Sequence, residues 1–288
     1  SVQSEMKEAL QAYAQWYKEG IIDPEFTTKD LEKMLQGEIS SSVGVSPYYQ
    51  YWGYDPGPNV VQNLGPDAIF EPYEIPSANG GEVKASVTFA NYGYIVVSKG
   101  CKNPEAVLKL LNFYAHVMDE GDEEDADFIN ELFENAYTNI PYALRVINPN
   151  TDYNQFVKVS GALEKGLDED PAALGKDGVK YSNSVDFIKE GASTGVGDYL
   201  QQGGPKAAYR ISKEIIDNEQ YIKDAMWGPA TETLLSAGST LDDILTEGFT
   251  KIIVGEESID YFDTLVDNWA KAGGTKATEE INETYGNN

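Results

Sequence analysis

Cysteine and histidine are almost absent from this chain of 288 residues, which has one of each, Cys101 and His116. A single cysteine excludes an intrachain disulfide and a zinc site built from several cysteines. A single histidine excludes the paired-histidine motif HExxH. It also leaves Ser/His/Asp and Cys/His catalytic sets without support, because His116 lies in the apolar helical stretch LLNFYAHVM. We therefore interpret His116 as structural and predict that the chain is not an enzyme, holds no metal and uses no cofactor.

Basic residues and long apolar runs are also scarce. The chain has 21 Lys and Arg against 48 Asp and Glu, a net charge of -27, and its arginines are Arg145 and Arg210. Such a surface repels phosphate backbones and anionic lipids, so we expect no nucleic acid and no membrane surface as a partner. No apolar run approaches the roughly 20 residues of a membrane span. With 41% hydrophobic and 11% aromatic residues, the composition predicts a globular chain with a sizeable core.

Apolar residues at helical spacing predict a chain dominated by helices. The helix that begins at Asn103, Pro104 and Glu105 has the strongest start signal, because proline is favoured at the first helical position and an acidic residue in the first turn. Helices are expected between Met6 and Gly20, between Thr27 and Gly37, from Pro104 through Val117, around 128–137 and 156–167, at 205–222, at 241–253 behind Ser239 or Thr240, and at 259–269 behind Ser258.

Strand signals are few. The segments ISSSVGVS (39–46) and VTFANYGYIVVSK (87–99) are rich in β-branched residues and predict strands. Two glycine-rich segments, 168–178 and 191–204, are interpreted as spacers between helices. The spacing of the acidic run 119–127 does not provide the glycine and the terminal glutamate of an EF-hand loop, and the run is interpreted as a solvated loop.

Aromatic residues gather in the loop SPYYQYWGYDPGP, where Pro and Gly disfavour a regular element. Rings in a loop can stack on the C–H faces of a sugar, although they can also cover the edge of a core. ANYGY places two polar candidates at the mouth of a strand, and a further tryptophan precedes the turn Gly228-Pro229. Trp16 and Trp269, on helices, are interpreted as core. The candidate ligand-binding residues are Tyr48, Tyr49, Tyr51, Trp52, Asn91, Tyr92 and Trp227.

Several segments resemble one bacterial family. They are YKEGIIDPEF, GEISSSVGV, NYGYIVVSKGCKNPEAVLKLLNFY and the C-terminal stretch from MWGPATET to INETYG. Together they are similar to extracellular solute-binding proteins of family 1, the sugar-binding ABC transporter lipoprotein type, in Gram-positive bacteria. The C-terminal stretch is the most specific, with Phe249 to Ile253, Asp260 to Trp269, Gly273-Gly274 and Glu280 to Glu283 in the order of the family's pattern.

The resemblance implies an α/β, periplasmic-binding-protein-like fold of two lobes (type II), helix-rich and without its N-terminal part. Residues 1–85 would form part of the C-terminal lobe, 86–218 part of the N-terminal lobe with the crossing segments, and 219–288 further helices of the C-terminal lobe. The chain begins without Met and shows no signal peptide or lipobox. Cys101 is not the lipid-attached cysteine, because it lies in the turn Lys-Gly-Cys-Lys-Asn. The full-length protein would be lipid-anchored at the cell surface.

The family's function would make this chain the extracellular solute-binding component of an ABC importer. An oligosaccharide would lie between the lobes, with the permease subunits as partners and the chain as a monomer. The loop at Tyr48 to Trp52 corresponds to the family's aromatic cleft segment, Asn91 and Tyr92 to the hinge strand, and Trp227 to a late cleft loop.

Three alternatives stay open at this point. The same fold could bind a peptide, an amino sugar or an anionic uronic-acid chain, the last of which calls for basic residues in the cleft. A carbohydrate-active enzyme would need two carboxylates facing each other across a cleft. A glycan-binding module without a role in transport would bind polymer without lobe closure.

Overall fold

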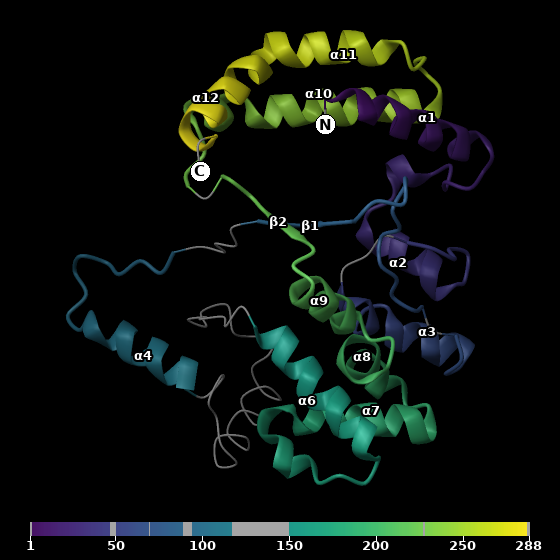
Figure 1. Cartoon of the computed structure of the whole chain (residues 1–288), viewed down its shortest axis with the longest axis vertical. Coiled ribbons are helices and arrows are strands. Elements are labelled where there is room, and N and C mark those ends of the chain that lie inside the picture. Colours follow the sequence, from purple (N-terminus) through teal and green to yellow (C-terminus); the bar gives the residue numbers. More distant parts are fainter. Residues whose placement is uncertain are drawn as a thin grey trace. The chain divides into compact units, whose positions relative to one another are not determined.

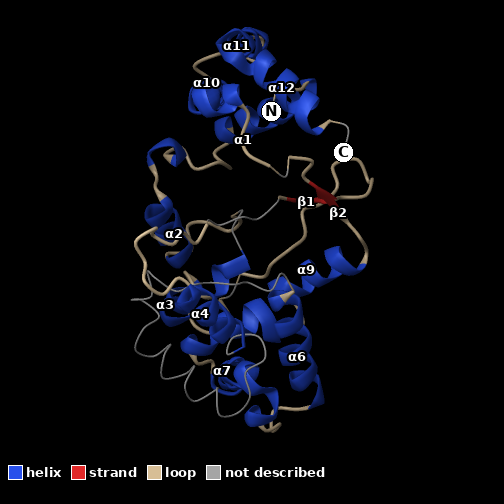
Figure 2. Cartoon of the chain, turned by 90° about the vertical axis from the view of Figure 1, so that its left-hand side faces the viewer, coloured by secondary structure: helices blue, strands red, loops and turns tan. Residues whose placement is uncertain are grey.

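The computed structural model describes residues 2–46, 50–68, 70–88, 94–116, 150–226 and 228–286. The chain divides into two compact units. Unit 1 comprises Ser1–Met34, Ser86–Phe89 and Lys223–Asn288, and unit 2 comprises Leu35–Ala85 and Ala90–Ile222. Both are built mainly from helices (Figure 2).

The strands of the described residues are β1 (Ala85–Val87) and β2 (Tyr221–Lys223), which pair in a two-stranded sheet. The Ala85 N–H donates to the Gln220 carbonyl at 2.9 Å, and the Asp224 N–H donates to the Val87 carbonyl at 2.9 Å. Because the paired positions ascend together along both segments, the strands are parallel. The chain passes from one unit to the other within each of these two segments.

Unit 1 is a helical assembly in which α1 (Ser4–Lys18) packs along α10 (Glu232–Val254), as Figure 1 shows. A 3₁₀ turn, η1 (Phe26–Thr28), follows α1. The C-terminal part contains α11 (Tyr261–Trp269), the π-helical turn η7 (Ala270–Gly274) and α12 (Thr275–Tyr285). Its core joins Leu10, Ile252 and Phe262. These residues come from three helices, so each helix buries one apolar stripe against the others.

Unit 2 contains most of the described helices. They are α3 (Gly57–Leu64), α4 (Glu105–Ala115), α6 (Thr151–Lys165), α7 (Gly178–Glu190), α8 (Val196–Asp198) and α9 (Ala208–Asp217), with the shorter helical turns η2 (Gln50–Gly53), η4 (Pro171–Asp177), η5 (Ser193–Gly195) and η6 (Tyr199–Gly203). α2 (Leu31–Ile39) begins in unit 1 and continues into unit 2. Residues 35–85 belong to the same unit as residues 90–222, because α3 and η2 pack on η5, α8 and η6.

Two hydrophobic clusters form the core of unit 2. One contains Trp52, Val60, Val61, Phe187, Val196 and Leu200. The other contains Val159, Ala162, Tyr181 and Val185. α7 contributes Phe187 to the first cluster and Tyr181 and Val185 to the second, and it therefore connects the two clusters.

The predicted strand over 39–46 is wrong. α2 runs to Ile39, and the carbonyl of Gly37 then accepts hydrogen bonds from the hydroxyl groups of Ser40 and Ser42 at 3.1 and 3.0 Å. The Ser42 N–H also donates to this carbonyl, at 2.9 Å. Serine hydroxyls that bond to nearby backbone offer the chain an alternative to a strand ladder, so the residues after α2 form turns.

The predicted strand over 87–99 also differs from the structure. β1 ends at Val87, residues 89–93 lie outside the described part, and 94–98 have no regular secondary structure. Val96 is 87% exposed. A β-branched sequence forms a strand where a partner strand and a packed face are supplied, and the described residues supply neither at 94–98.

The start of α10 lies nine residues before the predicted one. The prediction placed it at Leu241, whereas the structure begins it at Glu232. The reason is a contact from α12: the Glu280 carboxylate accepts the Thr233 N–H at 2.9 Å and the Thr233 hydroxyl at 2.7 Å. A distant carboxylate thus supplies the cap that a local residue usually supplies.

Glu280 should make the stability of unit 1 depend on acid. Hydrogen bonds from the Thr233 hydroxyl and backbone N–H lower the Glu280 pKa from its usual 4.5 to about 2. Because the Glu280 pKa is lower in the folded state than in the unfolded state, the ionised carboxylate stabilises the fold. This stabilisation is fully present above pH 4.5 and is lost as the pH falls toward 2. Glu280→Gln should lower the melting temperature at pH 7, measured by circular dichroism, and should reduce its decline between pH 4.5 and 2. The exposed Glu283→Gln on the same helix serves as the control, and an identical pH dependence in both variants would contradict the capping role.

Candidate functional site

The structure describes Tyr51 and Trp52 among the residues predicted to bind a ligand. Both lie in η2, in unit 2. The other predicted ligand-binding residues lie outside the described part of the chain: Tyr48, Tyr49, Asn91, Tyr92 and Trp227.

Trp52 points into the core of unit 2. Its side chain is 9% exposed, and its ring lies 4.8 Å from the Phe70 ring, centroid to centroid. Its indole N–H donates to the carboxylate of Glu38, which is itself fully buried. The faces of this ring are therefore occupied by the protein.

Tyr51 and Tyr54 form the exposed side of the same turn and are called the tyrosine platform below. Their side chains are 54% and 40% exposed. The Tyr54 N–H donates to the Tyr51 carbonyl at 2.9 Å, which continues the 3₁₀ geometry by one residue. Because side chains three residues apart lie above one another in a 3₁₀ helix, the two rings share one side of the turn. Tyr54 is thus a candidate that the predicted set omits.

The hydroxyl group of Tyr54 enters a polar cluster, called the Tyr54 network below. It donates to Asp198 Oδ1, and it accepts from Gln202 Nε2 at 3.0 Å and from Lys180 Nζ at 3.3 Å. Asn183 Nδ2 donates to Asp198 Oδ2 at 2.7 Å, and Lys180 Nζ lies 3.5 Å from Asp198 Oδ1. Lys180 Nζ also lies 5.8 Å from the centre of the Tyr54 ring. One tyrosine therefore presents a partly exposed ring while its hydroxyl group is held by three side chains, those of Asp198, Gln202 and Lys180.

Glycine under the Tyr54 ring makes this position possible. A Cβ atom on Gly197 would lie 2.3 Å from Tyr54 Cδ1. The backbone of α8 therefore comes closer to the ring than any other residue type would allow. The prediction that segment 191–204 is a spacer is therefore wrong. The segment is a largely buried helical stretch, because its glycines permit close packing.

Tyr209 connects the platform to a second carboxylate. This side chain is 3% exposed and accepts a hydrogen bond from Gln201 Nε2 at 2.9 Å. It also hydrogen-bonds with Asp152 and with Tyr51. Both rings of the platform are thus joined through hydroxyl groups to a carboxylate, Tyr54 to Asp198 and Tyr51 by way of Tyr209 to Asp152.

Two amide oxygens of the site have no hydrogen-bond partner among the described residues. They are Oε1 of Gln201 and Oε1 of Gln202, on side chains that are each 1% exposed. Both residues belong to the π-helical turn η6, a rare geometry that is frequent at functional sites. Burying an acceptor without a hydrogen-bond partner costs stability. Within the described part of the chain, this site therefore has more buried acceptors than donors.

Tyr54 and Tyr209 remain neutral over the physiological pH range. Burial, followed by the nearby charge of Asp198, raises the pKa of Tyr54. Burial, followed by the charge of Asp152, raises the pKa of Tyr209. Both phenols are therefore protonated hydrogen-bonding groups. Among the described residues, no group of three or more His, Cys, Asp or Glu side chains is placed to hold a metal ion.

The residues of the Tyr54 network carry little signal in the sequence. Lys180 and Asn183 lie on α7. Asp198 and Gln202 lie in the segment 191–204, which the sequence predicts to be a glycine-rich spacer. The useful signal was Tyr54 itself, in the same aromatic loop as the predicted residues. Its spacing of three from Tyr51, which suits a 3₁₀ turn, distinguishes the exposed pair from Trp52.

Unit 1 contains a separate surface pocket of about 460 Å³ between α1 and the end of α10. Its wall is mainly apolar and includes Ile252, Ile253 and Ile259, with Gln11 and Gln15 among its polar residues.

Trp16 lies on α1 and is 44% exposed, so the prediction that it belongs to the core is wrong. Its ring packs edge-on against Tyr13, with centroids 5.6 Å apart.

The chain is similar to a bacterial lipoprotein, lipoprotein LipO of Bacillus subtilis (strain 168). The two sequences are 26% identical over 204 residues, which cover 58% of this chain and 40% of the relative. The chain thus matches less than half the length of that lipoprotein. No model of a protein family matches the chain, and no solved structure matches it. No helix within the described ranges is long and apolar enough to cross a membrane.

Replacing Gly197 should disturb the tyrosine platform. In Gly197→Ala the new methyl group would meet the Tyr54 ring at 2.3 Å, so the ring or α8 must shift. We expect a loss of about 1–3 kcal/mol in the free energy of unfolding, as is usual for overpacking, measured by urea denaturation. Gly161→Ala is the matched control, since a Cβ there meets nothing within 4 Å and alanine favours a helix. Equal stability of the two variants would contradict the close approach.

Proposed function

We propose that this chain is the solute-binding component of an extracellular, lipid-anchored ABC import system and that its solute is an oligosaccharide. In this proposal the chain has the two-lobe, type II architecture and performs no covalent chemistry. The observation that carries the proposal is the tyrosine platform, a pair of half-exposed rings whose hydroxyl ends meet amides and carboxylates. Similarity to a bacterial lipoprotein supports the cellular setting.

The chemistry of the platform suits a sugar. A pyranose ring has C–H faces that stack on an aromatic ring, and contacts of this kind contribute roughly 0.5–1.5 kcal/mol beyond buried area by analogy with aromatic pairs. Its hydroxyl groups both donate and accept hydrogen bonds, as do the phenol groups of Tyr51 and Tyr54. The sites of small ligands typically combine such apolar surfaces with a few fixed polar groups.

The Tyr54 network would hold the platform in place before the ligand arrives. Asp198 fixes the Tyr54 hydroxyl, and Asn183 and Lys180 in turn fix Asp198. A ring held in advance loses little conformational entropy on binding, so more of the contact energy contributes to affinity. This carboxylate is therefore assigned to positioning.

Transport would follow from a change in population. A ligand that contacts both lobes binds the closed form more tightly than the open form and so shifts the equilibrium toward closure. The permease subunits would then recognise the closed, loaded form. The lipid anchor would keep the protein at the cell surface near these subunits.

The first test is a screen for stabilisation by glycans. The protein expressed from its complete gene should be heated with members of an oligosaccharide library, and unfolding followed by intrinsic fluorescence. A ligand present at one hundred times its Kd should stabilise the fold by about 2.7 kcal/mol. Failure of every oligosaccharide to bind, together with stabilisation by a peptide, would contradict the proposal.

The platform itself is tested by Tyr51→Ala. Because this ring is 54% exposed, its removal should leave the fold intact and weaken binding of the library's best oligosaccharide at least tenfold, about 1.4 kcal/mol, in calorimetric titration. Tyr73→Ala is the matched control, an exposed tyrosine of the same unit whose hydroxyl bonds to Glu71. An unchanged Kd in folded Tyr51→Ala would remove the platform from the binding site.

A further inference from the structure

We propose that Asn79 is a site of spontaneous modification, at which its side-chain amide reacts with the next backbone nitrogen and is converted to isoaspartate or aspartate. Asn79 lies in unit 2, in the exposed segment 78–84 that leads to β1. The reaction needs no ligand and is independent of the proposed binding function. It depends on the residue that follows Asn79, on the exposed bend around it, and on the hydrogen bonds to its amide oxygen.

The residue that follows Asn79 is glycine, and Asn79 is the one asparagine of the chain for which this is true. In the reaction the Gly80 nitrogen attacks Asn79 Cγ and closes a succinimide ring. Any other residue type has a Cβ atom beside the attacking nitrogen, which shields it and restricts the backbone rotation that brings it to Cγ. The sequence therefore favours reaction at Asn79 over the other asparagines.

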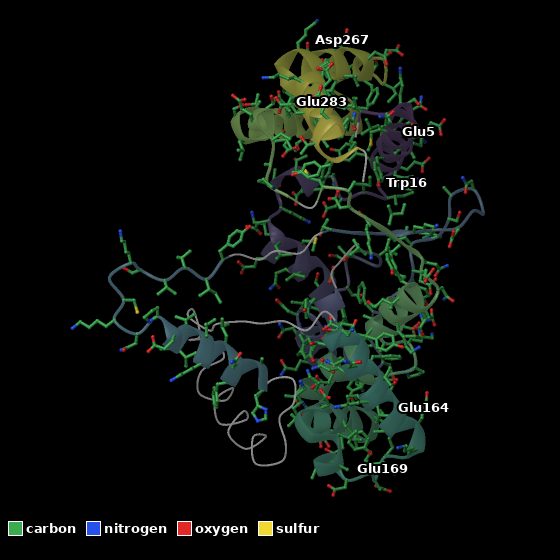
Figure 3. All side chains as sticks on the ribbon, turned by 60° about the vertical axis from the view of Figure 1, so that its left-hand side comes forward. Glu5, Trp16, Glu164, Glu169, Asp267 and Glu283 are labelled. Atoms are coloured by element: carbon green, nitrogen blue, oxygen red, sulfur yellow. The ribbon has the colours of Figure 1, made fainter. Side chains whose placement is uncertain are left out.

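The structure places Asn79 in an exposed bend. Residues 78–81 form the bend and residues 78–84 are exposed, and the side chains of this segment are drawn as sticks in Figure 3. Gly80 has φ 76°, in the left-handed region that glycine adopts at little cost. Exposed loop tips of this kind are where chemical change of a chain is best tolerated. Water therefore reaches the amide, and the backbone on either side of it can rotate.

Two donors contact the oxygen atom on which negative charge develops. Asn79 Oδ1 accepts the Gly81 N–H at 2.9 Å and the Ser77 hydroxyl at 3.2 Å. When a nitrogen adds to Cγ, the electrons of the C=O bond move to Oδ1, and donors already directed at this atom stabilise the charge of the tetrahedral intermediate. The Gly81 contact also closes a turn that folds the side-chain carbonyl back over its own backbone. The bend thus combines the attacking nitrogen with a small oxyanion site.

The reaction balances with water as its co-reactant. The Gly80 N–H gives its proton to hydroxide, the Gly80 nitrogen bonds to Cγ, and the bond between Cγ and Nδ2 breaks, so that ammonia leaves after taking a proton from water. A water molecule then opens the ring. Opening at Cγ gives aspartate, and opening at the backbone carbonyl carbon of Asn79 gives isoaspartate, in which the main chain runs through Cβ and Cγ. No atom is oxidised or reduced.

The fold should tolerate the product. Before the bend, Glu74 lies 3.8 Å from Arg210 Nη1, and after it, the Ala85 N–H donates to the Gln220 carbonyl at 2.9 Å. Between these two contacts, the paired glycines 80 and 81 can absorb the extra main-chain atom of isoaspartate. We therefore expect modification to add one negative charge to unit 2 and to leave its helices in place.

Asn183 provides an internal control in the same unit. It precedes another small residue, Ser184, but it lies on α7, and its Nδ2 donates to Asp198 Oδ2 at 2.7 Å. In an α-helix each backbone N–H is committed to the carbonyl four residues earlier, so the Ser184 nitrogen is held away from Asn183 Cγ. The Asn183 amide should therefore persist under conditions in which that of Asn79 is lost.

The direct experiment follows the asparagines as the protein ages. The protein expressed from its complete gene is incubated at 37 °C at pH 6 and at pH 8 and digested. Mass spectrometry then detects replacement of –NH2 by –OH, and enzymatic methylation detects the free α-carboxylate of isoaspartate. We expect Asn79 to convert at least tenfold faster than Asn183, and faster at pH 8, because loss of the N–H proton starts the reaction. An Asn79 amide that persists as long as that of Asn183 would overturn the proposal.

A glycine variant tests the role of the attacking residue. Gly80→Ala should slow conversion of Asn79 at least fivefold, because the new methyl group shields the nitrogen. The matched control is Gly44→Ala, at an exposed glycine of the same unit where a Cβ meets nothing within 4 Å, and it should leave the rate unchanged. Equal rates in the two variants would contradict attack by the Gly80 nitrogen.

A synthetic peptide of residues 74–84 separates the structure from the local sequence. The peptide has the same Asn-Gly pair without the rest of unit 2. The folded protein should convert at least as fast as the peptide, since the bend holds two donors on Asn79 Oδ1. A lower rate in the folded protein would show that the bend protects the amide, and it would overturn the proposal.

Discussion

The hydroxyl group of Tyr54 joins parts of unit 2 that are 144 residues apart in the sequence, by donating to Asp198. This contact depends on Gly197, because a side chain there would occupy the space of the ring. It also determines what the ring can do, since the polar end is buried while the ring stays partly exposed. The packing of α8 on η2 and the exposure of the platform therefore have one origin.

Unit 1 shows the same dependence on a long-range contact with different chemistry. Glu280 accepts two hydrogen bonds from Thr233, and α10 consequently begins nine residues before its local sequence signal. In both units a carboxylate satisfies groups on a distant element. The 48 acidic residues of the chain are thus not all solvated surface, although they were read from composition as one class.

The proposed binding function follows from one arrangement in unit 2. Stacking requires exposed rings, and hydrogen bonding to a sugar requires polar groups at their edges. In unit 2 those groups are the phenols of Tyr51 and Tyr54, and the Tyr54 hydroxyl donates to the carboxylate of Asp198.

Local sequence determined the helices whose signals are local. α1, α6 and α11 follow their apolar spacing, and Gly273, with φ 121°, lies between the predicted helix end at 269 and α12. The aromatic loop contains Tyr51, which is 54% exposed, and its role in ligand binding stays a prediction. Tertiary structure alone decided that Trp52 points inward and Tyr51 outward, because adjacent residues take opposite sides only once a core lies on one of them. Tertiary structure also decided that segment 191–204 supports the platform and is not a spacer. The need for glycine at position 197 becomes visible only when the Tyr54 ring is packed against it.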